Sequence, residues 1–141
     1  MDLKMIYTIG AMTRYDKLGE FNKAVDWRAN FSELIQKNKY VDIFDPTTNY
    51  RKNLNYNRKS VVSQNTHYLN RSSIGVVNLE HLEYSPGSMY EIFRMHWGGK
   101  PVIAFGNNKI VNQPHINESI TIRFDTLEEV VEYIENVFHL L

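Results

Sequence analysis

The stretch Ile74-Gly-Val-Val-Asn-Leu79, followed by Ser85-Pro-Gly-Ser-Met-Tyr-Glu91, decides the expected fold. A short apolar run, a polar loop and a helix opening predict a buried strand that leads into a helix. In an open α/β sheet, ligands bind at the carboxyl ends of the strands, where such loops lie. Glu91 is expected in the first turn of its helix, where unpaired N–H groups and the helix dipole favour an ionised carboxylate. An ionised carboxylate at a ligand cleft can act as a nucleophile or a base.

Ser88 and Glu91 also fit a purely structural role. Ser88-x-x-Glu91 matches a capping box, in which the serine hydroxyl and the glutamate carboxylate satisfy unpaired N–H groups at a helix start. Taken alone, the stretch favours this cap over a chemical role for Glu91. Other residues therefore have to decide between the two interpretations.

The composition favours a single globular domain over residues 1–141, with 43% hydrophobic and 23% charged residues. The 16 basic and 16 acidic residues cancel, which argues against a nucleic-acid polymer or an anionic membrane as the main partner. No apolar run approaches the ~18 residues of a membrane span. The lack of cysteine excludes disulfides and thiol nucleophiles and is typical of a cytoplasmic protein. The five histidines lack metal-ligand spacing, so a metal site is not expected. No other cofactor is expected either.

Apolar periodicity predicts that strands and helices alternate along the chain. Strands are expected at 5–9, 41–44, 74–79, 101–105 and 119–124. Helices are expected at 16–37, at 60–72 with Ser60 as N-cap, through 91–97, and from Thr126, which opens a capping box. This order predicts an α/β fold, namely a three-layer α/β/α domain with about five strands in a mainly parallel sheet of the Rossmann or flavodoxin type.

Two polar segments are candidates for contact with a ligand. Gly10 and Ala11 belong to a small-residue loop after the first strand, where a ligand can approach the backbone. Residues 47–59 are the most polar stretch, and Arg51 and Arg58 lie there among tyrosines, a combination suited to a phosphate or a stacked base. A solvent-exposed loop explains 47–59 equally well. The segment 106–117 is also expected to be a loop.

The central stretch carries a resemblance to a known family. Residues 85–91, followed by Ile92-Phe-Arg-Met95 and Gly99-Lys-Pro-Val-Ile103, resemble the signature of the nucleoside 2-deoxyribosyltransferase family. The first strand with its small-residue loop, Phe44-Asp45-Pro46 and the helix that carries Gln64-Asn65 are similar to the family as well. The similarity covers most of the chain in order and length, and it is most specific over 85–103.

The resemblance implies an enzyme that cleaves the N-glycosidic bond of a (deoxy)nucleoside or its 5′-monophosphate. In the family, the glutamate matching Glu91 attacks the sugar C1′ and forms a covalent glycosyl intermediate, which water or a second base resolves. By the same resemblance, Tyr7, Gly10 and Asn65 line the sugar and base pocket, and Ala11 and Asp45 belong to the substrate site. A homo-oligomer is implied on this ground alone.

Ser85 stands at a position that separates branches of the family. Transferases of free nucleosides carry an aspartate there, whereas relatives that hydrolyse nucleoside 5′-monophosphates carry serine. A carboxylate repels a phosphate, but hydroxyls and helix-start N–H groups bind one. Ser85, Gly87 and Ser88 therefore favour a phosphorylated small-molecule ligand, with Arg51 or Arg58 as further contacts.

Asn65 aligns with the family aspartate that helps to protonate the departing base. An amide cannot supply that proton, so Asn65 is limited to hydrogen bonding the base, and His67 or Tyr7 would have to substitute. This departure supports an alternative, a non-catalytic nucleotide-binding or sensing module on the same fold. A third hypothesis is a partner-binding protein that has kept only the fold.

Overall fold

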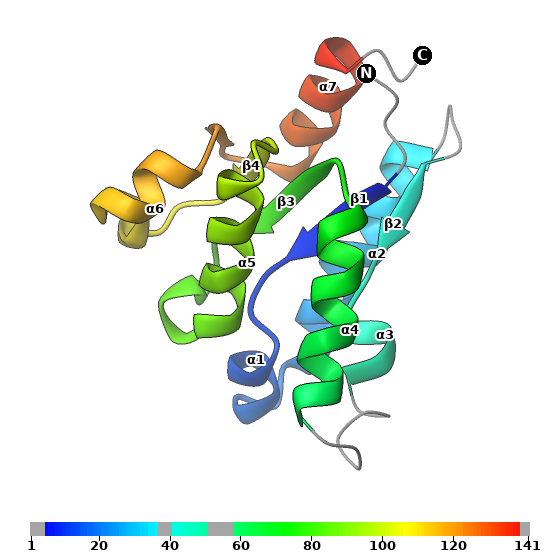
Figure 1. Cartoon of the computed structure of the whole chain (residues 1–141), viewed down its shortest axis with the longest axis vertical. Helices are drawn as coiled ribbons and strands as arrows, with labels where there is room; N and C mark the ends of the chain where they lie inside the picture. Colours follow the sequence, from blue (N-terminus) through cyan, green and yellow to red (C-terminus); the bar gives the residue numbers. More distant parts are fainter. Residues whose placement is uncertain (1–4, 37–40, 51–57, 139–141) are drawn as a thin grey trace.

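Five strands form the centre of the protein in the computed structural model, which describes residues 5–36, 41–50 and 58–138 (Figure 1). The strands are β1 (Met5–Ile9), β2 (Asp42–Phe44), β3 (Ile74–Asn78), β4 (Val102–Phe105) and β5 (Ile122–Phe124). Their order in the sheet is β2-β1-β3-β4-β5, and every pairing is parallel. The predicted α/β/α architecture with a five-stranded, flavodoxin-like parallel sheet is confirmed.

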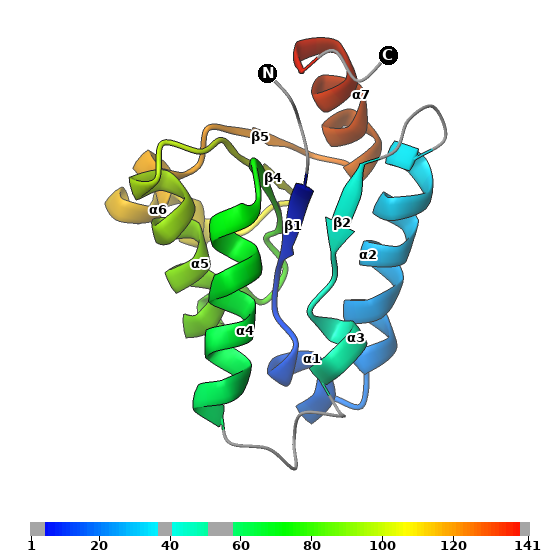
Figure 2. The same ribbon diagram turned by 45° about the vertical axis from the view of Figure 1, so that its right-hand side comes forward.

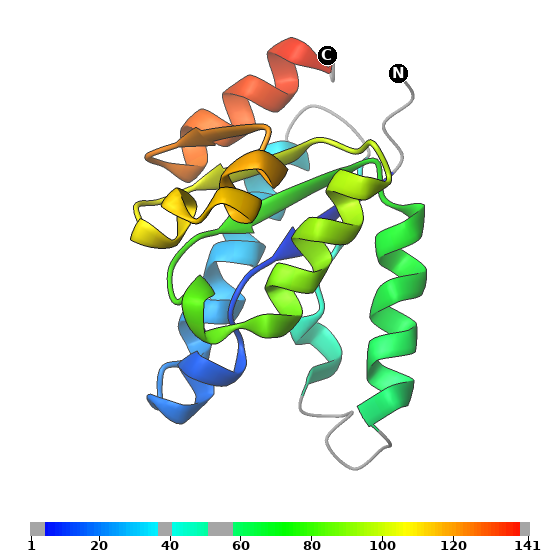
Figure 3. The ribbon, with the colours of Figure 1, turned by 60° about the vertical axis from the view of Figure 1, so that its left-hand side comes forward.

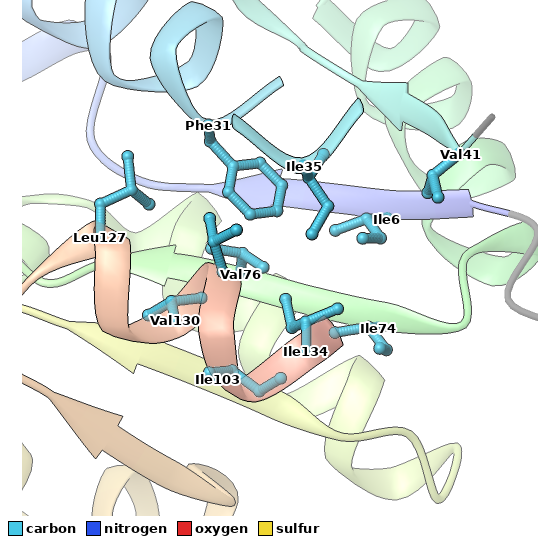
Figure 4. Close-up of a cluster of buried hydrophobic side chains, with 11 residues drawn as sticks. Ile6, Phe31, Ile35, Val41, Ile74, Val76, Ile103, Leu127, Val130 and Ile134 are labelled. Atoms are coloured by element: carbon cyan, nitrogen blue, oxygen red, sulfur yellow. The ribbon is translucent and has the colours of Figure 1, made fainter. Parts of the chain in front are cut away.

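Helices cover both faces of this sheet, as parallel strands require. On one face, α2 (Phe21–Gln36) and α7 (Leu127–Val137) bury the first core cluster, in which Phe31 and Ile134 pack over Ile6, Val76 and Ile103 (Figure 4). The other face carries α4 (Arg58–Arg71) and α5 (Pro86–Trp97), as the rotated view makes plain (Figure 2). Successive strand residues point to opposite faces, so β1 and β3 contribute to both clusters.

Gly75 explains how closely α5 approaches the sheet. A Cβ at this position would lie 3.1 Å from Ile9 Cδ1 and 3.3 Å from Met95 Cε, closer than such atoms normally come. A glycine on β3 therefore lets the Met95 side chain of α5 rest directly on the strand. This close packing of α5 against the sheet determines where its first turns stand relative to β1.

The helix expected at 16–37 is two helices, α1 (Thr13–Lys17) and α2. Gly19 separates them with a φ of 70°, in the left-handed region that favours glycine. The prediction of one continuous helix was wrong because the apolar spacing continues across the break. Its last residue, Lys37, lies outside the described residues.

The boundaries of α4 and the polar segment before it also differ from expectation. α4 begins at Arg58, so Ser60 lies inside the helix and is not its N-cap. Within the predicted loop 47–59, Thr47–Tyr50 forms the short helix α3, which starts where Asp45 Oδ1 accepts a hydrogen bond of 2.8 Å from Thr47 N–H. The remainder of that loop, 51–57, is outside the described residues.

The segment expected as a loop at 106–117 contains the 3-10 helix η3 (Lys109–Asn112) and the start of α6 (Pro114–Ser119). Side-chain oxygens of Asn108 and Gln113 accept hydrogen bonds from Ile110 N and Ile116 N and start these helices. β5 is consequently shorter than the expected strand 119–124. By contrast, Thr126 caps α7 as predicted, accepting from Glu129 N at 3.3 Å.

Candidate functional site

The strand order reverses at β1, so the carboxyl ends of β1 and β3 form the place where open α/β sheets bind ligands. Helix α1 and the chain leading through the 3-10 helix η2 (Leu82–Tyr84) into α5 lie beyond these strand ends (Figure 3). A cavity of about 310 Å³ opens here between α1, α4 and the start of α5. Its lining includes Arg14, Asn65, Ser85, Gly87, Ser88 and Glu91.

Glu91 is held by a tyrosine from the first strand. The hydroxyl of Tyr7, a side chain with no exposed surface on β1, donates a hydrogen bond to Glu91 Oε2. Burial raises the pKa of Glu91 to about 7, and the Tyr7 hydrogen bond and the charge of Arg28 oppose that rise. Burial and the nearby carboxylate also raise the pKa of Tyr7 well above its ordinary value. At neutral pH the pair therefore consists of a neutral phenol and a carboxyl group near its midpoint of ionisation.

The position of Glu91 differs from the sequence-based expectation. Because α5 starts at Pro86, Glu91 lies in the second turn, and the first turn holds no acidic residue. The prediction that the helix dipole keeps this carboxylate ionised was wrong, since burial acts in the opposite direction and dominates.

The capping box expected from Ser88 and Glu91 is not formed. Ser85 occupies the N-cap position without capping the first turn, and its hydroxyl lies 2.6 Å from the Ser88 hydroxyl. The Glu91 carboxyl group is directed to Tyr7 instead. The N–H groups of Gly87 and Ser88 precede the first helical bond, from Met89 N to Ser85 O, and so have no partner within the helix. A Cβ on Gly87 would meet no atom within 4 Å.

Asn65 lines the same cavity from α4, as the resemblance implies. Its amide forms no hydrogen bond with another described residue, so it is available to a ligand. His67, considered above as a proton donor, is exposed and packs edge-on against Tyr68, away from the cavity lining.

Three residues expected to contact substrate are placed elsewhere. Gly10 is buried, and a Cβ there would lie 3.2 Å from Trp27 Cζ2, so the glycine lets this ring pack closely. Ala11 is 1% exposed. Asp45 faces Arg28 and starts α3. None of the three lines the cavity.

Arg51 and Arg58 are not brought to the site by any described contact. Arg51 lies outside the described residues. Arg58 is the first residue of α4, and its side chain also falls outside the described part. Their predicted contact with a phosphate stays a prediction.

Arg28 is a functional candidate that the sequence analysis missed. This arginine of α2 is 1% exposed and donates to Ala24 O at 2.7 Å, Gly10 O at 3.0 Å and Thr8 Oγ1 at 3.2 Å. Its Nε lies 3.8 Å from Asp45 Oδ1. Burial lowers the pKa of Arg28 to about 10, which still leaves it charged at neutral pH, and this charge acts on both Tyr7 and Glu91.

The spacing of α2 contained a signal for this burial. Arg28 follows Ala24 by four residues and precedes Phe31 by three, so it lies on the apolar stripe of the helix. A charged residue on such a stripe is either at its edge or paired inside the protein.

Replacing Tyr7 with Phe is expected to raise the pKa of Glu91 above 7, because the hydroxyl stabilises the ionised carboxylate. Carbon-13 NMR titration of the glutamate carboxyl carbons measures this directly. Tyr15→Phe is the matched control, since the Tyr15 hydroxyl donates at 2.6 Å to a different carboxylate, Glu80. A Glu91 pKa that stays near 7 in Tyr7→Phe, or moves equally in both variants, contradicts the assignment.

Two further observations describe what the structure contains around the site. Among the described residues, no three His, Cys, Asp or Glu side chains gather as they would around a metal ion. In the same part of the chain, no helix has both the length and the apolar character needed to span a bilayer.

Comparisons with known proteins agree with the architecture. No protein-family model and no curated protein matches the chain. A 2-deoxyribosyltransferase from the psychrotolerant bacterium Bacillus psychrosaccharolyticus is similar over 92% of this chain and 91% of that chain, with 17% identity and a TM-score of 0.63. The chain has the fold of a 2-deoxyribosyltransferase. The resemblance drawn from residues 85–103 is thus confirmed at the level of the fold.

A second solved structure is also similar to this chain. A conserved protein from Enterococcus faecalis V583 is similar over 96% of this chain and 99% of that chain, with 19% identity and a TM-score of 0.67. Both likenesses span nearly the whole of this chain. At identities this low, the similarity establishes the fold alone. The chemistry has to be argued from the side chains of the site.

Proposed function

We propose that this protein cleaves the N-glycosidic bond of a nucleoside or a nucleoside 5′-monophosphate, with Glu91 as the nucleophile. The observation that supports this most strongly is the Tyr7–Glu91 pair beside a cavity at the switch point of the sheet. A carboxyl group with a pKa of about 7 is ionised in a large fraction of molecules at neutral pH. It can therefore attack a carbon that develops positive charge.

The proposed reaction has two steps. In the first, a Glu91 oxygen forms a bond to the sugar C1′ as the C1′–N bond breaks, and the base leaves with that electron pair and takes a proton from water. In the second, water attacks C1′, the ester bond to Glu91 breaks and the carboxylate is restored, and the proton that this water loses neutralises the hydroxide left by the first step. If a second base replaces the water, the sugar is transferred rather than hydrolysed.

The other residues of the cavity have supporting roles in this proposal. Asn65 hydrogen-bonds the base but does not supply a proton, because an amide is not an acid at neutral pH. Tyr7 holds one carboxylate oxygen and leaves the other for C1′. Ser85, Gly87 and Ser88 bind the 5′ end of the sugar at the start of α5. We place the protein in the cytoplasm as a homo-oligomer, on the resemblance and the composition.

The test is chromatographic detection of free base after incubation with a panel of nucleosides and their 5′-monophosphates. We expect the wild type to release base and Glu91→Ala to release none while remaining folded. Base release by Glu91→Ala at the wild-type rate overturns the role of Glu91, and release by neither protein overturns the proposed activity.

Asn65 favours one second candidate, a nucleotide-binding or sensing module without turnover. An amide lines the cavity at the position where the family has an acid, which removes a source of the proton that the departing base needs. In this case a nucleotide raises the melting temperature, whereas no base appears in the chromatogram.

A further inference from the structure

Helix α4 contributes an apolar face with a polar centre to the candidate cavity. Val62, Asn65, Thr66 and Leu69 line the cavity, and their spacing of three and four residues places them on one side of the helix. Val62 lies one turn before the two polar residues and Leu69 one turn after them. A flat ring can therefore rest against the two aliphatic side chains while its edge faces the polar residues between them.

The Asn65 amide is the group on this face that can recognise the edge of such a ring. It carries an acceptor oxygen beside a donor nitrogen, and no other described residue hydrogen-bonds to it. A carboxamide on a ligand offers the same two groups in reverse order, so the two amides can form a pair of parallel hydrogen bonds. The N6–N7 edge of adenine matches an asparagine in the same way. Hydrogen bonding alone therefore does not choose between these two kinds of ring.

No described residue of the cavity is suited to protonate a departing base. Among the described lining residues, Glu91 is the sole carboxyl group, and none is a histidine or a lysine. Glu91 has to be ionised to act as the proposed nucleophile, so it cannot donate a proton in the same step. The Tyr7 hydroxyl is bonded to Glu91. The other donors are hydroxyls, amide and peptide N–H groups and the Arg14 guanidinium, which hold their protons at neutral pH.

The need for that proton depends on the charge of the base. A neutral base such as adenine takes the electron pair of the C1′–N bond and leaves as an anion, and an acid that protonates it accelerates such a step by about 10²- to 10⁴-fold. A pyridinium ring carries a positive charge on the nitrogen that is bonded to C1′. The same electron pair neutralises this nitrogen, so the ring departs as an uncharged molecule without receiving a proton.

The charges at the cavity also suit a cationic ring. Attack of the Glu91 carboxylate on a pyridinium glycoside joins an anion to a cation and gives two uncharged products, a change that the burial around Glu91 favours because charges are poorly solvated there. The one cation among the described lining residues, Arg14, comes from α1. Its guanidinium carbon lies 4.1 Å from the centroid of the Tyr84 ring, so this charge is on the η2 side of the cavity, whereas Asn65 is on α4.

We propose that the cavity binds N-glycosides of a pyridinium ring whose carboxamide substituent pairs with Asn65, and that the protein cleaves them in preference to neutral nucleosides. The inference rests on the proposed function, whose substrate class it names. A Glu91 oxygen bonds to C1′ as the C1′–N bond breaks, and the electron pair stays on the nitrogen of a neutral pyridine carboxamide. Water then attacks C1′, the ester bond breaks, the carboxylate is restored, and one proton is released to the solvent.

The test compares kcat/KM for nicotinamide riboside and adenosine by chromatography of the released base. Both are also assayed as 2′-deoxy compounds and as 5′-monophosphates, so that only the base differs within each pair. We expect the pyridinium member to be cleaved at least about 100-fold faster, the lower end of what an acid contributes to the neutral one. Glu91→Ala measures the background for both. Since pyridinium glycosides are also intrinsically more reactive, a second experiment changes the protein instead of the substrate.

Asn65→Asp places an acid where the amide now stands and keeps its shape. It should raise kcat for adenosine about 10-fold or more, with a rate that falls as rising pH ionises the new carboxyl group. It should not raise kcat for nicotinamide riboside, whose ring leaves without a proton. Asn70→Asp is the matched control, because it makes the same change on α4 at a residue that does not line the cavity, and it should alter neither rate.

Asn65→Ala tests the pair of amides. In the Glu91→Gln background, where the ligand is not consumed, calorimetry should show that nicotinamide riboside binds about 5- to 50-fold more weakly after this change, as expected for the loss of two hydrogen bonds. Thermal unfolding of each variant checks that the fold is intact.

Three results overturn the inference: cleavage of adenosine as fast as that of nicotinamide riboside, an equal gain for both in Asn65→Asp, or unchanged binding in Asn65→Ala. Each of them leaves the proposed function intact as long as Glu91 is needed for the release of base. Release of base from neither compound, by contrast, refutes the proposed function and the inference together.

Discussion

Glu91→Gln is expected to lower the rate of base release by about 10³-fold or more, because the amide cannot form the glycosyl ester on which the proposed reaction depends. The shape of the side chain is kept, and the Gln carbonyl can still accept the Tyr7 hydroxyl. A loss of this size with an unchanged fold therefore reports chemistry and not unfolding. Base release per unit time under saturating substrate measures it.

The same substitution should stabilise the protein above pH 7. The pKa of Glu91 is about 7 in the folded protein against an ordinary value of 4.5, so the folded state holds the proton more tightly than the unfolded state. The free energy of unfolding consequently falls as the pH rises from about 4.5 to 7. Above that range the whole of this decrease, the cost of ionising Glu91 in the folded protein, is present. Gln avoids the cost, which we expect to be about 1 to 3 kcal/mol after allowance for solvent in the cavity.

Urea unfolding at pH 8 and pH 4.5 measures this difference. Glu80→Gln is the matched control, because Glu80 also accepts from a buried tyrosine, Tyr15, but does not line the cavity. Glu80→Gln should leave base release unchanged, and it should not remove the fall in stability between pH 4.5 and pH 8. Retained turnover in Glu91→Gln, or a loss of stability at pH 8, contradicts our assignment of Glu91.

Arg28→Met is expected to lower the free energy of unfolding by about 3 to 5 kcal/mol, the range for removing one partner of a buried charge pair. Three oxygens, at Ala24, Gly10 and Thr8, would each lose a hydrogen bond from the guanidinium, and Asp45 would lose its cation. Since this arginine joins α2, the end of β1 and the end of β2, its loss removes hydrogen bonds that hold these three elements together. Urea unfolding at pH 7 measures the change.

Arg28 also has an electrostatic effect that a merely structural residue would lack. Its charge lowers the pKa of Glu91, so Arg28→Met should move the midpoint of the rise in activity with pH above 7. Arg28→Lys keeps the charge and should retain the midpoint while losing part of the stability. Arg123→Met, which removes an exposed arginine bonded to Gly106 O, should cost less than about 1 kcal/mol. Unaltered stability in Arg28→Met contradicts this account.

Most of the fold could be predicted because the strands are short apolar runs separated by helices, a pattern that allows few topologies. The errors occurred where local chemistry competes with periodicity. Gly19 breaks an apolar stripe that continues on both sides of it. Gln113 starts α6, although glutamine is not a common N-cap residue. Neither effect is visible in hydrophobic spacing.

The candidate site was predicted in part. Residues 85–91 identified the correct helix, but its start was placed too late, although a proline at the first helical position, Pro86, marks it. The close approach of the Trp27 ring to Gly10 could not be predicted, because only tertiary packing reveals that contact. The sequence could not single out Arg28 as a functional candidate among the 16 basic residues, because its role depends on burial and on partners distant in the chain.

The covalent role of Glu91 is the central claim, and mass spectrometry of the acid-quenched protein tests it most directly. Wild-type protein mixed with a substrate that releases base should gain the mass of the sugar, with its phosphate if present, on the peptide that contains Glu91. Glu91→Gln should show no such adduct. Base release by the wild type without any adduct on that peptide, together with turnover by Glu91→Gln, would contradict the account.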